Sequence, residues 1–135
     1  MESMKLLENK VAIVTGATRG IGKAIAEVFA DNGADVIFTY VSSDDRAKAL
    51  EADLLSKGVR AKGYKFDVAD FSLCETIVAD IVKDFERIDI VVNNAGITRD
   101  TLLMRMSEEQ WDQVMTTNLK SVFNMTKAVQ RTMLK

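Results

Sequence analysis

The sequence contains no histidine, no proline and only one cysteine. Without histidine, neither Ser-His-Asp nor Cys-His catalysis can operate within this chain, and a transition-metal site is disfavoured. The single cysteine, Cys74, cannot form an internal disulfide, which favours a reducing, cytoplasmic setting. We interpret Cys74 as a small buried hydrophobic residue within a helix. Any chemistry must therefore come from a cofactor or from residues that the chain does not contain.

Long hydrophobic runs and a large net charge are absent as well. No apolar run approaches the length of a membrane span, and the first residues lack a signal-peptide pattern. The formal net charge is −2, with both signs scattered along the chain. We therefore expect neither nucleic acid nor a membrane as a partner. The hydrophobic share of 47% and the length of 135 residues fit a single soluble domain, residues 1–135.

Short β-rich runs alternate with stretches of helical periodicity along the chain. The expected strands are Lys10–Thr15, Val36–Val41, a run that ends at Phe66, and Ile88–Val92. The apolar residues expected on the first three helices are Ile21, Ile25, Val28 and Phe29, then Ala47, Leu50 and Leu54, then Leu73, Ile77, Ile81 and Phe85. This alternation predicts an α/β fold, a Rossmann-type doubly wound parallel sheet of four βα units with strand order 3-2-1-4.

Glycines and capping residues mark the expected helix ends. Gly33 and Gly58 follow the first two helices, where a left-handed residue commonly ends a helix. Ser43 or Asp44 can cap the second helix. The segment from Ser107 to Gln110 fits a capping box at the start of a long last helix, with two acids at its positive end.

The turn from Thr15 to Gly22 joins a predicted strand to a predicted helix and reads Thr-Gly-Ala-Thr-Arg-Gly-Ile-Gly. Gly16 permits a tight turn, Gly20 lets the backbone approach a diphosphate, and Gly22 lets the helix pack close to the sheet. The helix N-terminus then offers N–H groups and a partial positive charge to the phosphates. The alternative is that the three glycines are purely structural. The context of strand, turn and helix favours dinucleotide binding.

Two motifs together resemble those of the short-chain dehydrogenase/reductase family. The first is the Thr-Gly-x-x-x-Gly-Ile-Gly turn, and the second is Asn-Asn-Ala-Gly, residues 93–96, after the fourth predicted strand. The stretch from Asn94 to Ser107 closely resembles bacterial β-ketoacyl-acyl-carrier-protein reductases. The resemblance extends from Lys5 to Lys135. It implies an NADP(H)-binding Rossmann domain of an oxidoreductase, in a family whose members are often tetramers.

The charge near the end of the second strand bears on which dinucleotide binds. Folds that prefer NAD usually place an acid there to hold the ribose 2′-OH, whereas the residues from Thr39 to Val41 are neutral. The resemblance places Arg19 where it can pair with a 2′-phosphate, and the alternative is a solvated loop cation. Asp44 and Asp45 follow closely, and helix capping accounts for them. We therefore predict NADP(H) as the cofactor.

Two further segments follow strands at the edge where such sheets bind ligands. The resemblance implies that Asp67 and Val68 contact the adenine, and a turn-forming Asp67 is the alternative. It also implies that the Asn-Asn-Ala-Gly motif stabilises the sheet and lines the cofactor cleft, with a simple Asn-rich turn as the alternative. The expected cofactor-binding residues are Gly16, Ala17, Thr18, Arg19, Gly20, Ile21, Gly22, Tyr40, Val41, Asp67, Val68, Asn94, Ala95 and Gly96.

Asn118 is a polar residue within an apolar stripe of the last predicted helix. The apolar residues one and two turns away on either side are Trp111, Val114, Val122 and Met125. Burying an amide without partners costs about 1–3 kcal/mol, so the side chain must find hydrogen bonds. The resemblance implies a catalytic role, in which Asn118 holds a water of the proton relay and positions the active-site lysine. Satisfaction within the core is the alternative.

The family's Tyr-x-x-x-Lys motif and its assisting Ser are missing, since neither Tyr40 nor Tyr64 begins such a motif. The resemblance implies that the chain is roughly the first half of a family member, without its C-terminal part and inactive alone. The fourth strand would have an open edge, and the last helix, with Trp111, Val122 and Met133, would lack part of its packing. These two features predict that the chain alone is weakly stable or self-associates.

The resemblance implies that the parent protein uses NADPH to reduce a 3-oxoacyl thioester carried on acyl carrier protein, a step of fatty-acid biosynthesis. Another short-chain alcohol or sugar dehydrogenase is the nearest alternative, because the loops that shape the substrate site lie mostly beyond residue 135. A non-catalytic nucleotide-binding module is the second alternative, and the missing acid favours it for this chain taken alone.

Overall fold

Strands and helices alternate along the residues that the computed structural model describes, 5–95 and 105–134. In chain order the elements are β1 (Val11–Val14), α1 (Gly20–Asp31), β2 (Asp35–Tyr40), α2 (Asp44–Ser56), β3 (Ala61–Lys65), α3 (Phe71–Phe85), β4 (Ile90–Val92) and α4 (Glu108–Met133). The strands form one parallel sheet in the order β3-β2-β1-β4. The predicted α/β architecture and strand order are confirmed.

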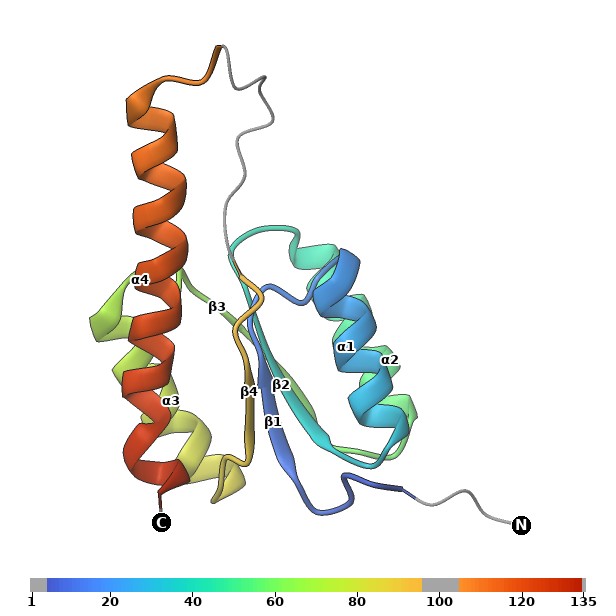
Figure 1. Ribbon diagram of the computed structural model, residues 1–135. Helices are drawn as coiled ribbons and strands as arrows, with labels where there is room; N and C mark the ends of the chain where they lie inside the picture. Colours follow the sequence, from blue (N-terminus) through green and yellow to red (C-terminus); the bar gives the residue numbers. More distant parts are fainter. Residues whose placement is uncertain (1–4, 96–104, 135) are drawn as a thin grey trace.

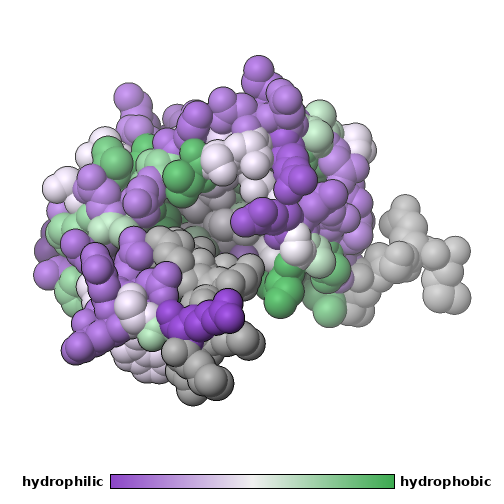
Figure 2. Space-filling view, turned by 90° about the horizontal axis from the view of Figure 1, so that it is seen from above, coloured by the Kyte–Doolittle hydropathy of each residue, from purple (hydrophilic) through white to green (hydrophobic). Residues whose placement is uncertain are grey.

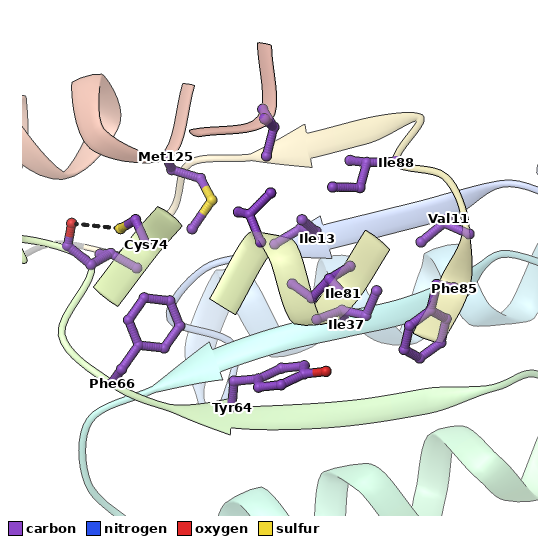
Figure 3. Packing of buried hydrophobic residues seen from close by; sticks show 13 residues of the cluster. Val11, Ile13, Ile37, Tyr64, Phe66, Cys74, Ile81, Phe85, Ile88 and Met125 are labelled. Atoms are coloured by element: carbon purple, nitrogen blue, oxygen red, sulfur yellow. Dashed lines mark hydrogen bonds between the residues drawn. The ribbon is translucent and has the colours of Figure 1, made fainter. Parts of the chain in front are cut away.

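The helices cover both faces of the sheet, α1 and α2 on one side and α3 and α4 on the other (Figure 1). Each face has its own hydrophobic core because successive strand residues point to opposite sides. Val36 and Phe38 of β2 pack with Leu50 of α2. Ile37, between them in sequence, belongs to the opposite cluster, with Met125 of α4 (Figure 3). Both faces of the central strands are therefore fully buried, as in other parallel sheets.

Helix α1 packs on the sheet through small residues and not through all of the large apolar side chains that the periodicity predicted. Its buried residues are Gly22, Ala26 and Ala30. Ile21 is 74% exposed and Val28 is 55% exposed. Small side chains let the helix approach the sheet closely, which displaces the larger ones toward solvent. The helix itself was predicted correctly, and part of its buried face was wrong.

The buried stripe of α3 agrees with the predicted one at Ile81 and Phe85 and is shifted by one residue before them, where Cys74 and Val78 replace Leu73 and Ile77. It consists of Cys74, Val78, Ile81 and Phe85. Leu73, which the spacing placed first on this stripe, is 41% exposed. The buried position of Cys74 confirms its interpretation as a small core residue. In α2 the buried residues are those predicted from the spacing.

Capping follows the prediction at α4 and departs from it at α2. The backbone N–H of Gln110 donates to Ser107 Oγ at 3.1 Å, and the N–H of Ser107 donates to Gln110 Oε1 at 3.0 Å, which is the predicted capping box. Ser43 stands at the N-cap of α2 in the left-handed region, with φ 68°, and its side chain makes no capping hydrogen bond. Asp44 forms an ion pair with Lys65, with 3.0 Å between Oδ1 and Nζ.

Asp89 joins the entry of β4 to the start of β1. Its carboxylate accepts a hydrogen bond from the backbone N–H of Val11 at 2.8 Å and forms an ion pair with Arg87 at 2.6 Å. Partial burial alone would raise the pKa of Asp89. The bonds from Arg87 and Val11 and the positive charges of Arg87 and Lys10 outweigh burial, so the pKa lies below its usual value. The charged carboxylate therefore stabilises this corner.

One face of α4 is not covered by any of the described residues. Its exposed large hydrophobic side chains are Trp111, Met115, Leu119, Val122, Phe123 and Met133. Among the described strands, β4 pairs with β1 alone, so its other edge is open. Exposed apolar surface of this kind agrees with the incomplete packing expected for the last helix. No helix in the described ranges combines the length and apolar character needed to cross a membrane.

Candidate functional site

A pocket of about 460 Å³ opens at the carboxyl edge of the sheet, where the strands end and the helices α1 and α2 begin. Figure 2 looks down on this edge, and hydrophilic side chains make up most of it, with hydrophobic side chains among them on both halves. The predicted site residues that line the pocket are Gly16, Thr18, Arg19, Gly20, Ile21, Tyr40, Val41, Val68, Asn94 and Ala95. Segments far apart in sequence thus meet at one place, as ligand-binding crevices of such sheets require.

The glycine turn has the backbone geometry that its sequence predicts. Gly16 has φ +65°, and a Cβ there would lie 2.9 Å from the Cα of Ala95. Gly20 has φ +60°, and nothing described lies within 4 Å of where its Cβ would be. A Cβ on Gly22 would overlap the carbonyl oxygen of Gly16. Gly16 and Gly22 are therefore required for packing, whereas Gly20 presents bare backbone to the pocket.

The N-terminus of α1 is open at this pocket. Its N-cap residue, Arg19, has an extended backbone and makes no capping hydrogen bond with its side chain, and the first turn contains no acid. By contrast, Asp70 caps α3 and Ser107 caps α4 through their side chains. The first N–H groups of a helix have no partner within the helix. Those of α1 therefore lie beside the pocket, where the positive end of the helix favours an anion.

Thr15 ties the glycine turn to the Asn-Asn-Ala-Gly motif. Its hydroxyl accepts hydrogen bonds from the backbone N–H of Asn94 at 2.9 Å and of Ala95 at 2.8 Å. The side-chain amide of Asn94 donates to the carbonyl of Gly16 at 3.0 Å. Thr15 is 2% exposed. This partly buried network holds the two motifs in one geometry, and the predicted role of the Asn-Asn-Ala-Gly motif in lining a cofactor cleft stays a prediction.

The far wall of the pocket is fixed at Val68 by two other elements. Asn124 of α4, which is 1% exposed, donates through Nδ2 to the Val68 carbonyl at 3.1 Å. The thiol of Cys74 on α3 donates to the same oxygen at 3.4 Å (Figure 3). Burial, with the nearby carboxylates of Asp70 and Asp67, raises the pKa of Cys74 to about 11. The thiol therefore stays neutral and serves as a donor.

Among the predicted cofactor residues that the structure describes, three do not line the pocket. Ala17 is fully buried behind the turn, and Gly22 packs beneath it. The carboxylate of Asp67 accepts a hydrogen bond from the N–H of Ala69 at 2.9 Å, so Asp67 forms a turn beside the pocket, and its predicted contact with the adenine stays a prediction. Gly96 lies outside the described residues.

Sequence reasoning missed several residues that build the pocket. Those in its lining are Thr39, Ser42, Ser43 and Phe66. Thr39 was read only as a neutral strand residue, yet its Oγ1 lies 3.3 Å from the N–H of Gly16 and accepts from it. Asn124 was overlooked although it lies beside Met125 on the buried face of α4. The argument applied to Asn118, a polar amide on an apolar helix face, would have found it.

Asn118 is less enclosed than its spacing predicted. Asn118 is half-buried. Its apolar neighbours Trp111 and Val122 are 53% and 42% exposed, so they do not enclose its side chain. The buried residues of α4 are Ser121, Asn124, Met125 and Val129, further toward its C-terminus. The predicted role of Asn118 in a proton relay stays a prediction.

Across residues 5–95 and 105–134, no group of three or more His, Cys, Asp or Glu side chains is placed to hold a metal ion. The donors at the pocket are instead backbone N–H groups, hydroxyls and a guanidinium. Such a donor set is suited to phosphate groups.

A family model described as short chain dehydrogenase matches residues 10–135. The chain is 50% identical over 129 residues to the 3-oxoacyl-acyl-carrier-protein reductase FabG of Haemophilus influenzae, covering 96% of this chain and 52% of the relative. It is 52% identical to the FabG of Vibrio cholerae, covering 96% of this chain and 51% of the relative. The chain thus spans about half the length of the curated relatives it matches.

Solved structures agree with this likeness. A short-chain dehydrogenase from Burkholderia cenocepacia in complex with NADP superposes with a TM-score of 0.85 at 38% identity, over 93% of this chain and 51% of that one. A xylitol dehydrogenase bound to NAD⁺ superposes with a TM-score of 0.88 at 31% identity, over 96% of this chain and 50% of that one. The matched residues, the sheet order and the geometry of the glycine turn lead to one conclusion: the chain belongs to the short-chain dehydrogenase family.

Proposed function

We propose that this chain is the dinucleotide-binding part of an NADPH-dependent oxidoreductase that reduces 3-oxoacyl thioesters carried on acyl carrier protein. The observation that carries the proposal is the open N-terminus of α1 beneath the glycine turn, which faces the pocket at the carboxyl edge. The identity of about 50% to 3-oxoacyl-acyl-carrier-protein reductases supports the choice of substrate class.

The residues of the pocket fit a nicotinamide dinucleotide. The N–H groups of Gly20, Ile21 and Gly22 begin α1 and have no partner within the helix, so they can bind a diphosphate. The exposed side chain of Ile21 offers apolar contact at the same mouth. Val68 can line the adenine end, where its carbonyl is already engaged by Asn124.

The cofactor, when bound, supplies a hydride for the carbonyl carbon of the substrate. The chain's own residues contribute binding and orientation. The network of Thr15, Gly16 and Asn94 fixes the turn that holds the phosphates. Asn118, on α4, is proposed to hold a water in the relay that delivers the proton. The proton donor is proposed to be the Tyr of the Tyr-x-x-x-Lys motif that the resemblance implies.

Two measurements test the proposal. Titration of the chain with NADPH, followed by fluorescence, is expected to give saturable binding. The protein that contains this chain together with the remaining half of the family fold should oxidise NADPH with an acetoacetyl thioester of acyl carrier protein, and the 135-residue chain alone should not. Turnover by the chain alone would contradict the proposal that this chain binds the cofactor but does not supply the proton donor.

An NAD-dependent alcohol or sugar dehydrogenase is the second candidate, favoured by the similarity to the NAD⁺-bound xylitol dehydrogenase. Activity assays with the two kinds of substrate separate the two candidate functions. Oxidation of xylitol or a related polyol with NAD⁺, and no reduction of the acyl thioester, would select the second candidate. A chain that binds neither dinucleotide would exclude both.

A further inference from the structure

One wall of the pocket at the carboxyl edge belongs to the hydrophobic core. Phe66 and Val68, in the loop between β3 and α3, line the pocket. Their side chains are only 7% and 5% exposed. They belong to the core cluster that also contains Cys74 of α3 and Met125 of α4 (Figure 3). The shape of this wall therefore depends on how α3 and α4 hold it.

The peptide unit between Val68 and Ala69 is held from both sides. Its N–H donates to the Asp67 carboxylate at 2.9 Å, within the turn beside the pocket. Its carbonyl oxygen, which belongs to Val68, accepts from Asn124 Nδ2 at 3.1 Å and from Cys74 Sγ at 3.4 Å. Within the described ranges, no backbone N–H donates to that oxygen. Because a peptide unit is planar, the direction of the carbonyl also sets the direction of the N–H that orients Asp67.

Asn124 is the stronger of the two donors and comes from a helix whose described residues do not line the pocket. An amide N–H is a full hydrogen-bond donor, whereas a thiol is a weak one. Asn124 is 1% exposed, so little water competes for its bond. The other buried polar side chain of α4, Ser121, donates to the Thr117 carbonyl of its own helix at 2.8 Å. Asn124 thus links α4 to the pocket wall, and Ser121 does not.

We propose that Asn124 is a positioning residue for the adenosine half of the dinucleotide, acting through the carbonyl of Val68. The inference rests on the proposed function, in which Val68 lines the adenine end. Asn124 draws this carbonyl into the core, so the Val68 side chain and the carboxylate of Asp67 are placed before the ligand arrives. A wall that is ordered in advance spares the ligand the entropic cost of ordering it. Asn124 therefore raises the affinity of the site without contacting the ligand.

The test follows the binding of NADPH, and of adenosine 2′,5′-bisphosphate as its adenosine half, to the full chain by amide NMR. Asn124→Leu keeps the branched shape of the side chain and removes the donor. It should weaken the binding of both ligands about fivefold, within the range that one neutral hydrogen bond contributes. At saturation with NADPH, the amide shifts at Gly20 and Gly22 should match those of the wild type, whereas those at Val68 and Ala69 should differ.

Two further variants keep the test decisive. Ser121→Ala removes a buried hydrogen bond from the same helix without contact to the pocket wall, so it should lower stability and change neither affinity. Cys74→Ala removes the weaker donor to the same carbonyl and should weaken the binding of both ligands about twofold. If Asn124→Leu does not fold, Cys74→Ala with Ser121→Ala as its control decides the inference.

Each result supports or overturns the inference. Unchanged affinity in Asn124→Leu, or in Cys74→Ala where the former does not fold, would overturn it and leave the proposed function in place. The same loss of affinity in Ser121→Ala, or altered shifts at Gly20 and Gly22, would also overturn it, because a general loosening of the fold would then account for the loss. A wild-type chain that binds neither ligand would overturn the proposed function, and this inference with it.

Discussion

Replacing Thr15 with Val removes one hydroxyl from the junction of the two motifs and keeps nearly the same volume. The hydroxyl accepts from the backbone N–H groups of Asn94 and Ala95. The N–H of Asn94 also lies 3.1 Å from the carbonyl of Val92 and keeps that partner. The N–H of Ala95 keeps none among the hydrogen bonds that the described residues make. The substitution therefore leaves one half-buried donor unsatisfied.

The expected cost follows from that single donor. An unsatisfied buried N–H destabilises a protein by about 1–3 kcal/mol, and the partial exposure of Ala95 places Thr15→Val near the middle of that range or below. The free energy of unfolding should fall by about 1.5 kcal/mol. With a urea dependence of about 2 kcal/mol per molar, the unfolding midpoint should fall by roughly 0.7 M. Thr15→Ser keeps the hydroxyl and loses one methyl group, which should cost about 1 kcal/mol or less.

The assay is urea unfolding followed by circular dichroism, at a concentration where sedimentation shows a monomer. Hydrogen exchange gives a local reading, since the amide of Ala95 should lose protection in Thr15→Val and retain it in Thr15→Ser. If Thr15→Val proves as stable as the wild type, and Thr15→Ser the weaker variant, then packing and not the hydroxyl holds this junction. That order would refute the reasoning.

Three further predictions concern other parts of the fold. Gly22→Ala should lower the unfolding free energy by about 1–3 kcal/mol, since its Cβ would overlap the carbonyl of Gly16; a thermal melt unchanged from wild type would contradict this. The Cys74 thiol, with a pKa raised to about 11, should react with a thiol reagent at pH 8 far more slowly in the folded chain than in urea, and equal rates would count against its burial. Asp89 has a lowered pKa, so it contributes stability that is present above the unfolded-state pKa of about 4 and lost as the pH falls through the folded value. Asp89→Asn should therefore flatten the acid side of the stability profile, and an unchanged slope would argue against the ion pair with Arg87.

Sequence patterns predicted those features of the fold that depend on residues close together in the chain. The turn residues Gly16, Gly20 and Gly22 could be recognised because left-handed backbone and close approach restrict those positions to glycine. The capping box at Ser107 depends on residues three apart in sequence. The strand order followed from the alternation of strands and helices, together with the resemblance.

The contacts between distant segments could not be predicted in the same way. Thr15 and Asn94 are 79 residues apart, and nothing in either neighbourhood indicates their hydrogen bond. Periodicity placed Ile21 in the core because it counts apolar residues, whereas the helix packs through its smallest side chains. Asn118 and Asn124 present the same signal on α4, and only the fold shows that Asn124 is the more buried of the two.

The most direct test of the central claim is to locate the bound dinucleotide on the chain by amide NMR. The account predicts that NADPH shifts the backbone amide signals from Gly16 to Gly22 most strongly, with smaller changes at Val68 and Asn94, because a diphosphate at the N-terminus of α1 receives those N–H groups directly. Binding that shifts other amides and leaves those of Gly20, Ile21 and Gly22 unchanged would contradict the account.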